Sequence, residues 1–303
     1  MSFSIQILGS GSAVPTSNRS LTSQYIECSN RHILIDCGEG TQTQMRKFGV
    51  KFQRIDIILI SHLHGDHYFG LVGLLSTMHL LGRVKPIKIF APSELKEIVM
   101  NQLNYGGARL SYDIEFIASN DDRLNLLFED EKITIQSFPL SHKIPTTGFL
   151  ITEKQKARKL IAAKVKRDNI KIAHLHILKS GQDALGENGE LISFEKYTKE
   201  SPPAKSYAFC SDTKYYEAVV PYIKNATLLY HEATFTEFFI DRAKATMHST
   251  AQQAARIASA AKVDRLLMGH LSARYGSGDE HVLEASPIFE NCEVVEDGNT
   301  YFV

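Results

Sequence analysis

The sequence lacks an excess of charge of either sign. Its 303 residues hold 34 Lys or Arg and 34 Asp or Glu, so the formal net charge is zero. This balance excludes a chain that binds nucleic acid or a membrane through bulk positive charge, although a local basic patch is compatible with it. Long apolar runs are also missing, because no stretch approaches the 18 or more residues of a membrane span. The N-terminal segment resembles no secretory leader, and we therefore expect a cytoplasmic protein without a membrane partner.

Cysteine is scarce as well. Only four occur, far apart and without a CxxC pair, which excludes a disulfide framework and a thiolate zinc site. Hydrophobic residues make up 43% of the chain, and a chain near 300 residues buries roughly three quarters of its unfolded surface. We therefore expect a large core that needs no covalent cross-link.

Short apolar runs typical of strands alternate with segments of helical periodicity. The strand-like runs are 4–8, 23–27, 32–36, 55–61, 87–90, 133–138, 206–210, 227–230 and 265–268, and the helical segments are 41–48, 92–103 and 249–261. In the last helix, either Ser249 or Thr250 can cap the first turn. This interleaving predicts an α/β protein rather than an all-β sandwich.

One segment differs in composition from the rest. Residues 153–171 contain eight Lys or Arg against two acidic residues, and turn-rich sequence follows them. The composition is typical of an insertion that projects from a core. By itself, a run of charge favours a solvated surface helix over a binding surface for an anionic partner.

The motif SHLHGDH at positions 61–67 directly follows a buried apolar run. It places His62, His64, Asp66 and His67 within six residues. Imidazole and carboxylate groups are the ligands expected for Zn²⁺, Mn²⁺ or Fe²⁺. Four such groups on one turn favour a metal site, and an irregular loop allows one pair to face one ion and the other pair a second ion.

Three further candidate ligands stand in the same context. His142, Asp212 and His270 each follow an apolar strand-like run. Side chains that leave the same ends of several strands can converge at one edge of a sheet. Together they would supply one imidazole for each ion and a carboxylate able to bridge them.

Several motifs in this order resemble the ribonuclease Z family of the metallo-β-lactamase superfamily. The superfamily motif HxHxDH is met at 62–67, and the narrower resemblance is carried by LGSGSAVPTSNRS, IDCGEGTQTQ, HEATF, HST and GHLSARY between residues 8 and 275. The resemblance implies a four-layer αββα sandwich, formed by one catalytic domain over residues 1–303 with a protruding basic arm at about 153–203. It also implies a homodimer that removes the 3′ trailer from precursor tRNA. The arm would grip the tRNA, and its candidate contacts are Lys159, Lys164, Lys166 and Arg167.

The same resemblance implies a set of ligands for two Zn²⁺ per subunit, and Mn²⁺ suits these ligands equally. One ion would be held by His62, His64 and His142, the other by Asp66, His67 and His270, with Asp212 bridging both. Two cations this close make a bridging water acidic and stabilise charge on phosphate oxygens, which is phosphodiesterase chemistry. Asp66 is then the natural acceptor of the water's proton.

Four other residues lie inside the quoted motifs, namely Asp36, Glu232, His248 and Arg274. His248, held by Glu232, matches an acid for the leaving 3′ oxygen, and its alternative is to open the helix that follows. Arg274 could contact a phosphate or pair with a carboxylate such as Glu232. Asp36 is expected to orient the first histidine loop rather than to bind metal.

Two other functions remain compatible with the sequence. One is a general phosphodiesterase of the same superfamily, which would not require tRNA. The other is a non-catalytic RNA-binding relative, which the complete ligand set disfavours.

Overall fold

The computed structural model describes residues 3–107, 109–119 and 122–303. The chain divides into two compact units, of which the second is Glu153–Ala204 and the first contains the residues before and after it. Among the helices of the described residues, none is long and apolar enough to cross a membrane.

A seven-stranded sheet forms the first half of the larger unit, in the order β18-β1-β2-β3-β4-β5-β6. Strands β3 to β6 are parallel, and β18, β1, β2 and β3 pair antiparallel. The strands are β1 (Phe3–Gly9), β2 (Ser23–Cys28), β3 (Arg31–Ile35), β4 (Ile57–Leu59), β5 (Ile87–Ala91), β6 (Ile114–Ala118) and β18 (Thr300–Phe302).

A second seven-stranded sheet has the order β17-β16-β15-β14-β9-β8-β7. Strands β14 to β17 are parallel, and β9 pairs antiparallel with β14. The strands are β7 (Asn125–Glu129), β8 (Ile133–Pro139), β9 (Thr147–Glu153), β14 (Ser206–Cys210), β15 (Leu228–Glu232), β16 (Leu266–Gly269) and β17 (Cys292–Val294).

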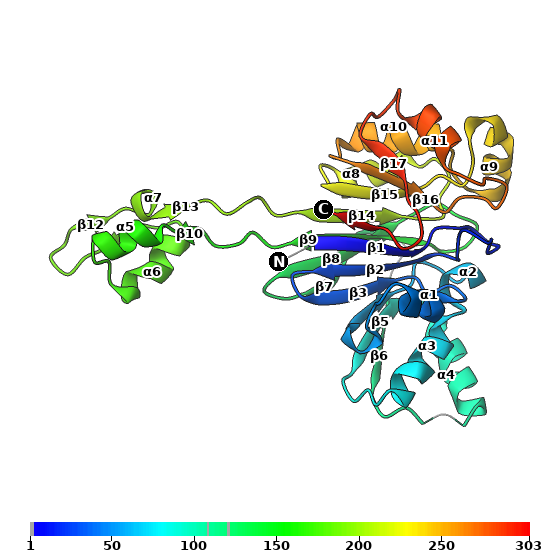
Figure 1. The fold of residues 1–303 in the computed structure, drawn as a ribbon, viewed down its shortest axis with the longest axis horizontal. Helices are drawn as coiled ribbons and strands as arrows, with labels where there is room; N and C mark the ends of the chain where they lie inside the picture. The colour runs from blue at the N-terminus through cyan, green and yellow to red at the C-terminus, as the bar shows by residue number, and fades with distance from the viewer. Residues whose placement is uncertain (1–2, 108, 120–121) are drawn as a thin grey trace. The chain divides into compact units, whose positions relative to one another are not determined.

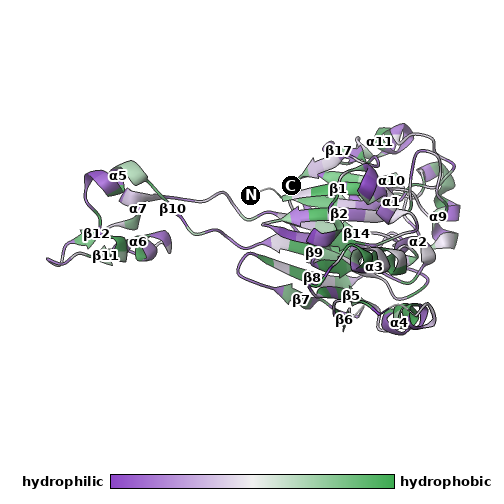
Figure 2. Ribbon diagram, turned by 60° about the horizontal axis from the view of Figure 1, so that its bottom comes forward, coloured by the Kyte–Doolittle hydropathy of each residue, from purple (hydrophilic) through white to green (hydrophobic). Residues whose placement is uncertain are grey.

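The two sheets pack face to face, with helices on both outer faces (Figure 1). Apolar side chains from both sheets form one continuous core between them, in which Ile5 of β1 and Phe149, Phe209 and Tyr230 of the second sheet are completely buried. The strands are largely apolar along this core (Figure 2). The predicted α/β fold and four-layer αββα sandwich are therefore confirmed.

Each outer face is covered by its own helices. The first sheet packs against α1 (Thr41–Lys47), α3 (Leu71–Leu80) and α4 (Leu95–Tyr105), and the second against α8 (Val220–Ile223), α10 (Ala251–Ala261) and α11 (Asp279–Ala285). Short connecting elements are η1 (Phe52–Arg54), α2 (Gly65–Tyr68), η2 (Glu217–Val219), η3 (Glu237–Phe239) and α9 (Ile240–Thr246).

Helix α10 shows how the local sequence sets an element. Thr250, rather than Ser249, caps it, because the Thr250 hydroxyl accepts from the N–H of Gln253 while the Gln253 side chain accepts from the N–H of Thr250. Such a reciprocal cap satisfies two backbone donors that the helix leaves unpaired. Ala254 and Ile257 lie on the buried face of the helix.

The second unit has a small core of its own. Leu178, Ala184, Ile192 and Tyr197 are buried together. Its elements are β10 (Lys159–Leu160), α5 (Ala162–Arg167), α6 (Ile172–Lys179), β11 (Ala184–Leu185), β12 (Leu191–Ile192), α7 (Phe194–Tyr197) and β13 (Thr198–Lys199).

Candidate active site

Candidate ligands from both sheets meet at one edge of the sandwich. The loop after β4 and the short helix α2 supply the 62–67 cluster, while His142, Asp212 and His270 follow β8, β14 and β16. Asp212 and His270 have φ of 57° and 58°. This left-handed conformation is costly for residues with a side chain and collects at functional sites.

One group of ligand atoms belongs to His62, His64, His142 and Asp212. The Nδ1 of His64 lies 3.0 Å from Nε2 of His62 and 3.2 Å from Nε2 of His142. The Oδ2 of Asp212 lies 3.5 Å from Nε2 of His62 and 3.6 Å from Nε2 of His142. Two donors on a tetrahedral zinc with bonds of 2.0–2.1 Å would be about 3.3 Å apart, so these separations suit one ion.

A second group of ligand atoms belongs to Asp66, His67 and His270. The Oδ2 of Asp66 lies 3.5 Å from Nε2 of each of the two histidines. The Oδ1 of Asp212 lies 3.2 Å from Nε2 of His67 and 3.1 Å from Nε2 of His270. Asp212 therefore turns one carboxylate oxygen toward each group, as a bridging ligand would.

In four histidines, Nδ1 donates a hydrogen bond away from the site, so that Nε2 faces the site. His67 donates from Nδ1 to Asp36 Oδ2 over 2.7 Å, and His142 donates from Nδ1 to the carbonyl oxygen of Met247 over 2.9 Å. A ring that donates from Nδ1 keeps a lone pair on Nε2, which is the form that binds a metal.

The other two histidines are held through hydroxyl groups that relay to a carboxylate. Ser61 Oγ donates to Asp36 and lies 3.0 Å from Nδ1 of His62, so it accepts from that ring. Thr234 Oγ1 donates to Glu232 over 2.6 Å and lies 3.0 Å from Nδ1 of His270. The single O–H of each hydroxyl is already donated to a carboxylate. The hydroxyl oxygen can therefore only accept a hydrogen bond from the histidine.

Two orphaned nitrogen atoms show that these residues fit a metal. Nε2 of His67 and Nε2 of His270 are buried and make no hydrogen bond among the described residues. A buried polar atom without a partner costs roughly 1–3 kcal/mol. Binding a cation at each nitrogen would remove this cost.

The pKa directions differ between the buried donors. Burial holds the pKa of His62 well below its usual value, so its ring is neutral. Burial opposes protonation of His67 as well, but the carboxylates of Asp212, Asp36 and Asp66 raise its pKa well above the usual value, so a bound cation would take the place of its Nε2 proton. Burial opposes ionisation of Asp212, but His270 and His67 beside it hold its pKa well below the usual range. Neutral imidazole and ionised carboxylate are the forms that coordinate metals.

Glu232 ties together the elements on the other side of the site. Its buried carboxylate accepts from the N–H of Thr213 over 2.8 Å, from Thr234 Oγ1, from the N–H of Ser249 over 3.2 Å and from Nδ1 of His248 over 2.7 Å. These donors come from the Asp212 loop, the end of β15 and the start of α10. The carboxylate of Glu232 therefore fixes the positions of three loops relative to one another.

His248 does not cap α10, because Thr250 does. Its ring instead pairs with Glu232, and a ligand atom of His248 lies within 4.8 Å of ligand atoms of Asp212 and His270. Burial favours the neutral ring, but the Glu232 charge and hydrogen bond overcome it and raise the pKa of His248 to about 9. His248 is thus a cation at neutral pH, beside the metal ligands.

The site opens into a pocket whose walls come from distant parts of the chain. Besides Asp66, His142 and His248, the pocket is lined by residues that the sequence did not single out, namely Ala13, Glu39, Phe69, Lys143 and Thr246. The N–H of Ala13 donates to Asp66 Oδ2 over 2.8 Å. Both Ala13, in LGSGSAVPTSNRS, and Thr234, in HEATF, lie inside quoted motifs, but neither motif indicates which contact the residue makes.

Arg274 does not pair with Glu232 in the described part of the chain. Its guanidinium group lies 5.5 Å from the ring centre of Phe235 and 5.1 Å from that of Phe239, and Nη1 donates to Ser272 Oγ over 3.0 Å. The guanidinium group of Arg274 is therefore positioned by two aromatic rings, which do not neutralise its charge. This leaves Arg274 available for an anionic group.

The candidate RNA contacts of the second unit differ in whether their charge is already paired with an acidic side chain. Arg167 pairs with Asp168 over 2.7 Å. Lys159 and Lys166 are exposed and, with Lys164, form no ion pair with a described residue. Lys159 lies directly opposite Lys199 in the β10–β13 pair. Like charges in that arrangement are unfavourable without an anion between them.

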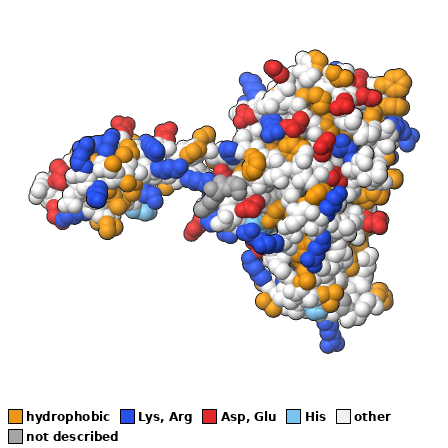
Figure 3. All heavy atoms as spheres, in the orientation of Figure 1, with side chains coloured by type: hydrophobic (Ala, Val, Ile, Leu, Met, Phe, Trp, Pro, Cys, Tyr) orange, Lys and Arg blue, Asp and Glu red, His pale blue; other side chains and the backbone are white. Residues whose placement is uncertain are grey.

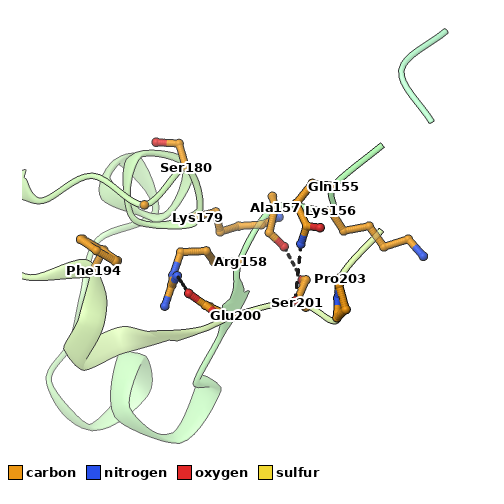
Figure 4. Close-up of a pocket in the computed structure, with 11 residues that line it drawn as sticks. Gln155, Lys156, Ala157, Arg158, Lys179, Ser180, Phe194, Glu200, Ser201 and Pro203 are labelled. Carbon is orange, nitrogen blue, oxygen red and sulfur yellow. Dashed lines mark hydrogen bonds and ion pairs between the residues drawn. The ribbon is translucent and has the colours of Figure 1, made fainter. Parts of the chain in front are cut away.

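The second unit also contains an open pocket with basic walls. Lys156, Arg158 and Lys179 line it, and Arg158 pairs with Glu200 over 3.2 Å (Figure 4). Many Lys and Arg side chains are visible on the surface of this unit (Figure 3). Residues 153–204 hold 11 Lys or Arg and 7 Asp or Glu.

Comparison with known proteins gives one family model and many curated relatives. The family model described as Anti-Pycsar protein Apyc1 matches residues 3–156. Ribonuclease Z of Bacteroides fragilis is 43% identical over 291 residues, which cover 95% of each chain. Ribonuclease Z of Parabacteroides distasonis is 42% identical over 296 residues, which cover 98% of this chain and 97% of the relative.

Solved structures of other proteins are similar to this chain over nearly its whole length. Human tRNase Z, short form, has a TM-score of 0.72 at 27% identity, covering 98% of both chains. The metallo-beta-lactamase fold protein YhfI from Bacillus subtilis has a TM-score of 0.70 at 16% identity, covering 100% of both chains. The second likeness concerns the fold alone.

The first prediction concerns Asp36, which accepts from Ser61 and His67. Asp36→Asn should lower the affinity for Zn²⁺ about 10- to 100-fold, because it weakens the hydrogen bond that orients His67. Competition with a chromogenic chelator measures this affinity. Asp56→Asn, which changes an acid paired with Lys85 at the surface, is the control and should leave the affinity unchanged. Equal affinities for both variants would contradict the role of Asp36.

The second prediction concerns the pair of Glu232 and His248. In metal-free protein, Glu232→Gln should lower the pKa of His248 from about 9 toward its usual value, as followed by NMR of the ring protons. Because the folded pKa exceeds the unfolded value of about 6.5, the stabilisation from His248 is complete below that pH and is lost as the pH rises through about 9. Wild-type protein should therefore lose more unfolding free energy than Glu232→Gln between pH 7 and 10. Equal losses would contradict the pairing.

Proposed function

The chain belongs to the ribonuclease Z family, and on this premise we propose that it removes the 3′ trailer from precursor tRNA at the site around Asp212. The resemblance seen in the motifs is confirmed by relatives of 42–43% identity over nearly the whole chain. The chain is accordingly a metal-dependent hydrolytic endoribonuclease. The observation that carries the proposal is the carboxylate of Asp212, which lies between two groups of imidazole donors.

We assign two Zn²⁺ per chain to these donors, and Mn²⁺ suits them as well. One ion would be held by His62, His64 and His142 and the other by Asp66, His67 and His270, with Asp212 shared. Bound there, two such ions would acidify the attacking water and stabilise the charge on the phosphate oxygens.

The chain's own residues would move the protons. Asp66, whose Oδ2 is fixed by the N–H of Ala13, would accept the proton of the attacking water. The water oxygen bonds to phosphorus as the bond from phosphorus to the 3′ oxygen breaks. His248, a cation at neutral pH, would donate its proton to that leaving oxygen. The products are a tRNA with a 3′-hydroxyl and a trailer with a 5′-phosphate.

The second unit would add affinity for tRNA. We propose that Lys159, Lys164 and Lys166 contact phosphates, with a smaller contribution from Arg167 because Asp168 already pairs with it. In the first unit, Arg274 would bind a phosphate near the cut. From the family resemblance we also propose a cytoplasmic homodimer.

A smaller phosphodiester is the second candidate substrate. It is favoured by the match of residues 3–156 to the Anti-Pycsar Apyc1 model, a segment that holds five of the seven proposed ligands. Efficient cleavage of a nitrophenyl phosphodiester together with no cleavage of precursor tRNA would support this alternative.

The third prediction tests the reaction itself. Metal-loaded protein should cut precursor tRNA at the start of its 3′ trailer, as mapped on a sequencing gel. Asp66→Ala should abolish the cut while circular dichroism shows an intact fold. His248→Ala should lower kcat about 10²- to 10⁴-fold with unchanged metal content, because only the proton donor is lost. If the loaded protein leaves precursor tRNA uncut with both Zn²⁺ and Mn²⁺, the proposed function is wrong.

The fourth prediction tests the lysines of the second unit. Lys159→Ala combined with Lys199→Ala should weaken tRNA binding and reduce the slope of log K against log salt by about 1 for each phosphate that is no longer neutralised. Lys85→Ala is the control, because Lys85 pairs with Asp56 in the first unit. The same slope for wild type and the double variant would exclude these lysines from the interface.

A further inference from the structure

Phe69 is an exposed aromatic residue in the wall of the active-site pocket. It directly follows α2, which carries Asp66 and His67. It lines the pocket together with Asp66, His142 and His248, yet 64% of it is exposed. A single exposed hydrophobic residue is common and needs no explanation by itself. Its place beside the proposed reaction centre is what calls for one.

The ring of Phe69 is held in position. A Cβ added to Gly65 would lie only 2.2 Å from Cε2 of this ring and 2.4 Å from its Cζ, so the ring rests on the glycine backbone. Tyr68 meets it in a T-shaped arrangement with ring centres 5.0 Å apart. The N–H of Phe69 donates to the carbonyl of Gly65 over 3.0 Å. A ring restrained by such contacts loses less conformational entropy when a ligand covers it than an unrestrained ring would.

The same pocket offers a cation. Lys143 lines it next to His142. A flat apolar ring and an ammonium group in one pocket match the two parts of a nucleotide, its base and its phosphate. Proteins that recognise single-stranded RNA stack unpaired bases on aromatic side chains in this way.

We propose that Phe69 is the stacking platform for the unpaired nucleobase next to the scissile phosphate. The inference rests on the proposed function and deepens it, because it names the part of the substrate that the pocket wall recognises. The base lies on the ring, which places its own phosphate near the proposed metal ligands Asp66 and His67 of α2. Phe69 thus contributes to the selection of an unpaired nucleotide at the cut.

The fifth prediction compares Phe69→Leu with Phe302→Leu. The two phenylalanines are equally exposed, at 64% and 65%, but Phe302 lies on β18 and does not line the pocket. Stacking on an aromatic side chain contributes about 1–3 kcal/mol per base, so kcat/KM for precursor tRNA should fall about 5- to 150-fold in Phe69→Leu and stay constant in Phe302→Leu. Phe69→Trp should restore it, because any aromatic face can stack. Metal content and circular dichroism establish that each variant is folded.

A fluorescent substrate reports the stacking directly. Two precursor tRNA substrates are prepared, each with a non-cleavable linkage at the scissile position. One carries 2-aminopurine on the 5′ side of that linkage and the other carries it on the 3′ side. Stacking should quench the fluorescence at one of these positions in wild type and Phe69→Trp but not in Phe69→Leu. An abasic nucleotide at the quenched position should slow cleavage by wild type and cause no further loss in Phe69→Leu.

The outcomes separate the two proposals. Unchanged kcat/KM in Phe69→Leu, or equal quenching in all variants, would overturn the stacking role while tRNA cleavage stands. Quenching that depends on Phe69 in a protein that leaves precursor tRNA uncut would support the stacking role and overturn the proposed function.

Discussion

The carboxylate of Asp212 is the group on which the rest of the site depends. It is almost completely buried, and an ionised carboxylate in such a place is costly unless it is surrounded by compensating partners. Imidazole nitrogens from both halves of the sandwich lie 3.1–3.6 Å from its two oxygens. Cations bound between these oxygens and nitrogens would compensate the charge of the carboxylate. Asp212 therefore links the two donor groups into one centre.

The packing of the two sheets brings the donors to Asp212. In the second sheet, the parallel strands β14, β15 and β16 are in register, with Cys210 opposite His231 and His231 opposite Met268. Side chains that follow these strands must emerge at the same edge. The 62–67 cluster leaves β4 of the other sheet, and the core between the sheets holds the two edges together. Core packing is thus a condition for the chemistry and not only for stability.

The elements and ligands that could be predicted from the sequence are those with a local signal. Each of the nine apolar runs overlaps a strand, and the seven candidate ligands lie together at the strand ends. Strands β6, β7, β9, β17 and β18 lie outside the predicted runs. Strands β17 and β18 have only three residues each, which is too short for a periodic pattern. Helix α3 was missed because it is apolar on most of its circumference, which hides helical periodicity.

Contacts that orient the ligands were harder to predict, for a different physical reason. The acceptor for His142 is the carbonyl oxygen of Met247, 105 positions away, and the donor to Asp66 is the N–H of Ala13, 53 positions away. Every residue has a backbone carbonyl and nearly every residue a backbone N–H, so neither contact leaves a trace in residue type. Met247 has φ of 62° and Ala13 has φ of 53°, a conformation that is uncommon for residues other than glycine and that residue type does not predict here. The ligands can thus be predicted from residue type. Much of their orientation, however, depends on backbone groups whose positions are set by tertiary packing.

The net charge of zero also has a structural meaning. Residues 153–204 carry four more positive than negative side chains, and the remaining residues carry 23 Lys or Arg against 27 Asp or Glu. A cationic unit can bind phosphates without any excess of charge on the chain as a whole, because such contacts are local and screened within about 10 Å at 0.1 M salt. The catalytic unit, by contrast, keeps buried carboxylates such as Asp36, Asp212 and Glu232, which would repel an RNA backbone by themselves. Cations held by Asp212 and the other proposed ligands would reverse that local charge, so the catalytic unit would depend on its metals to receive the phosphate as well as to cleave it.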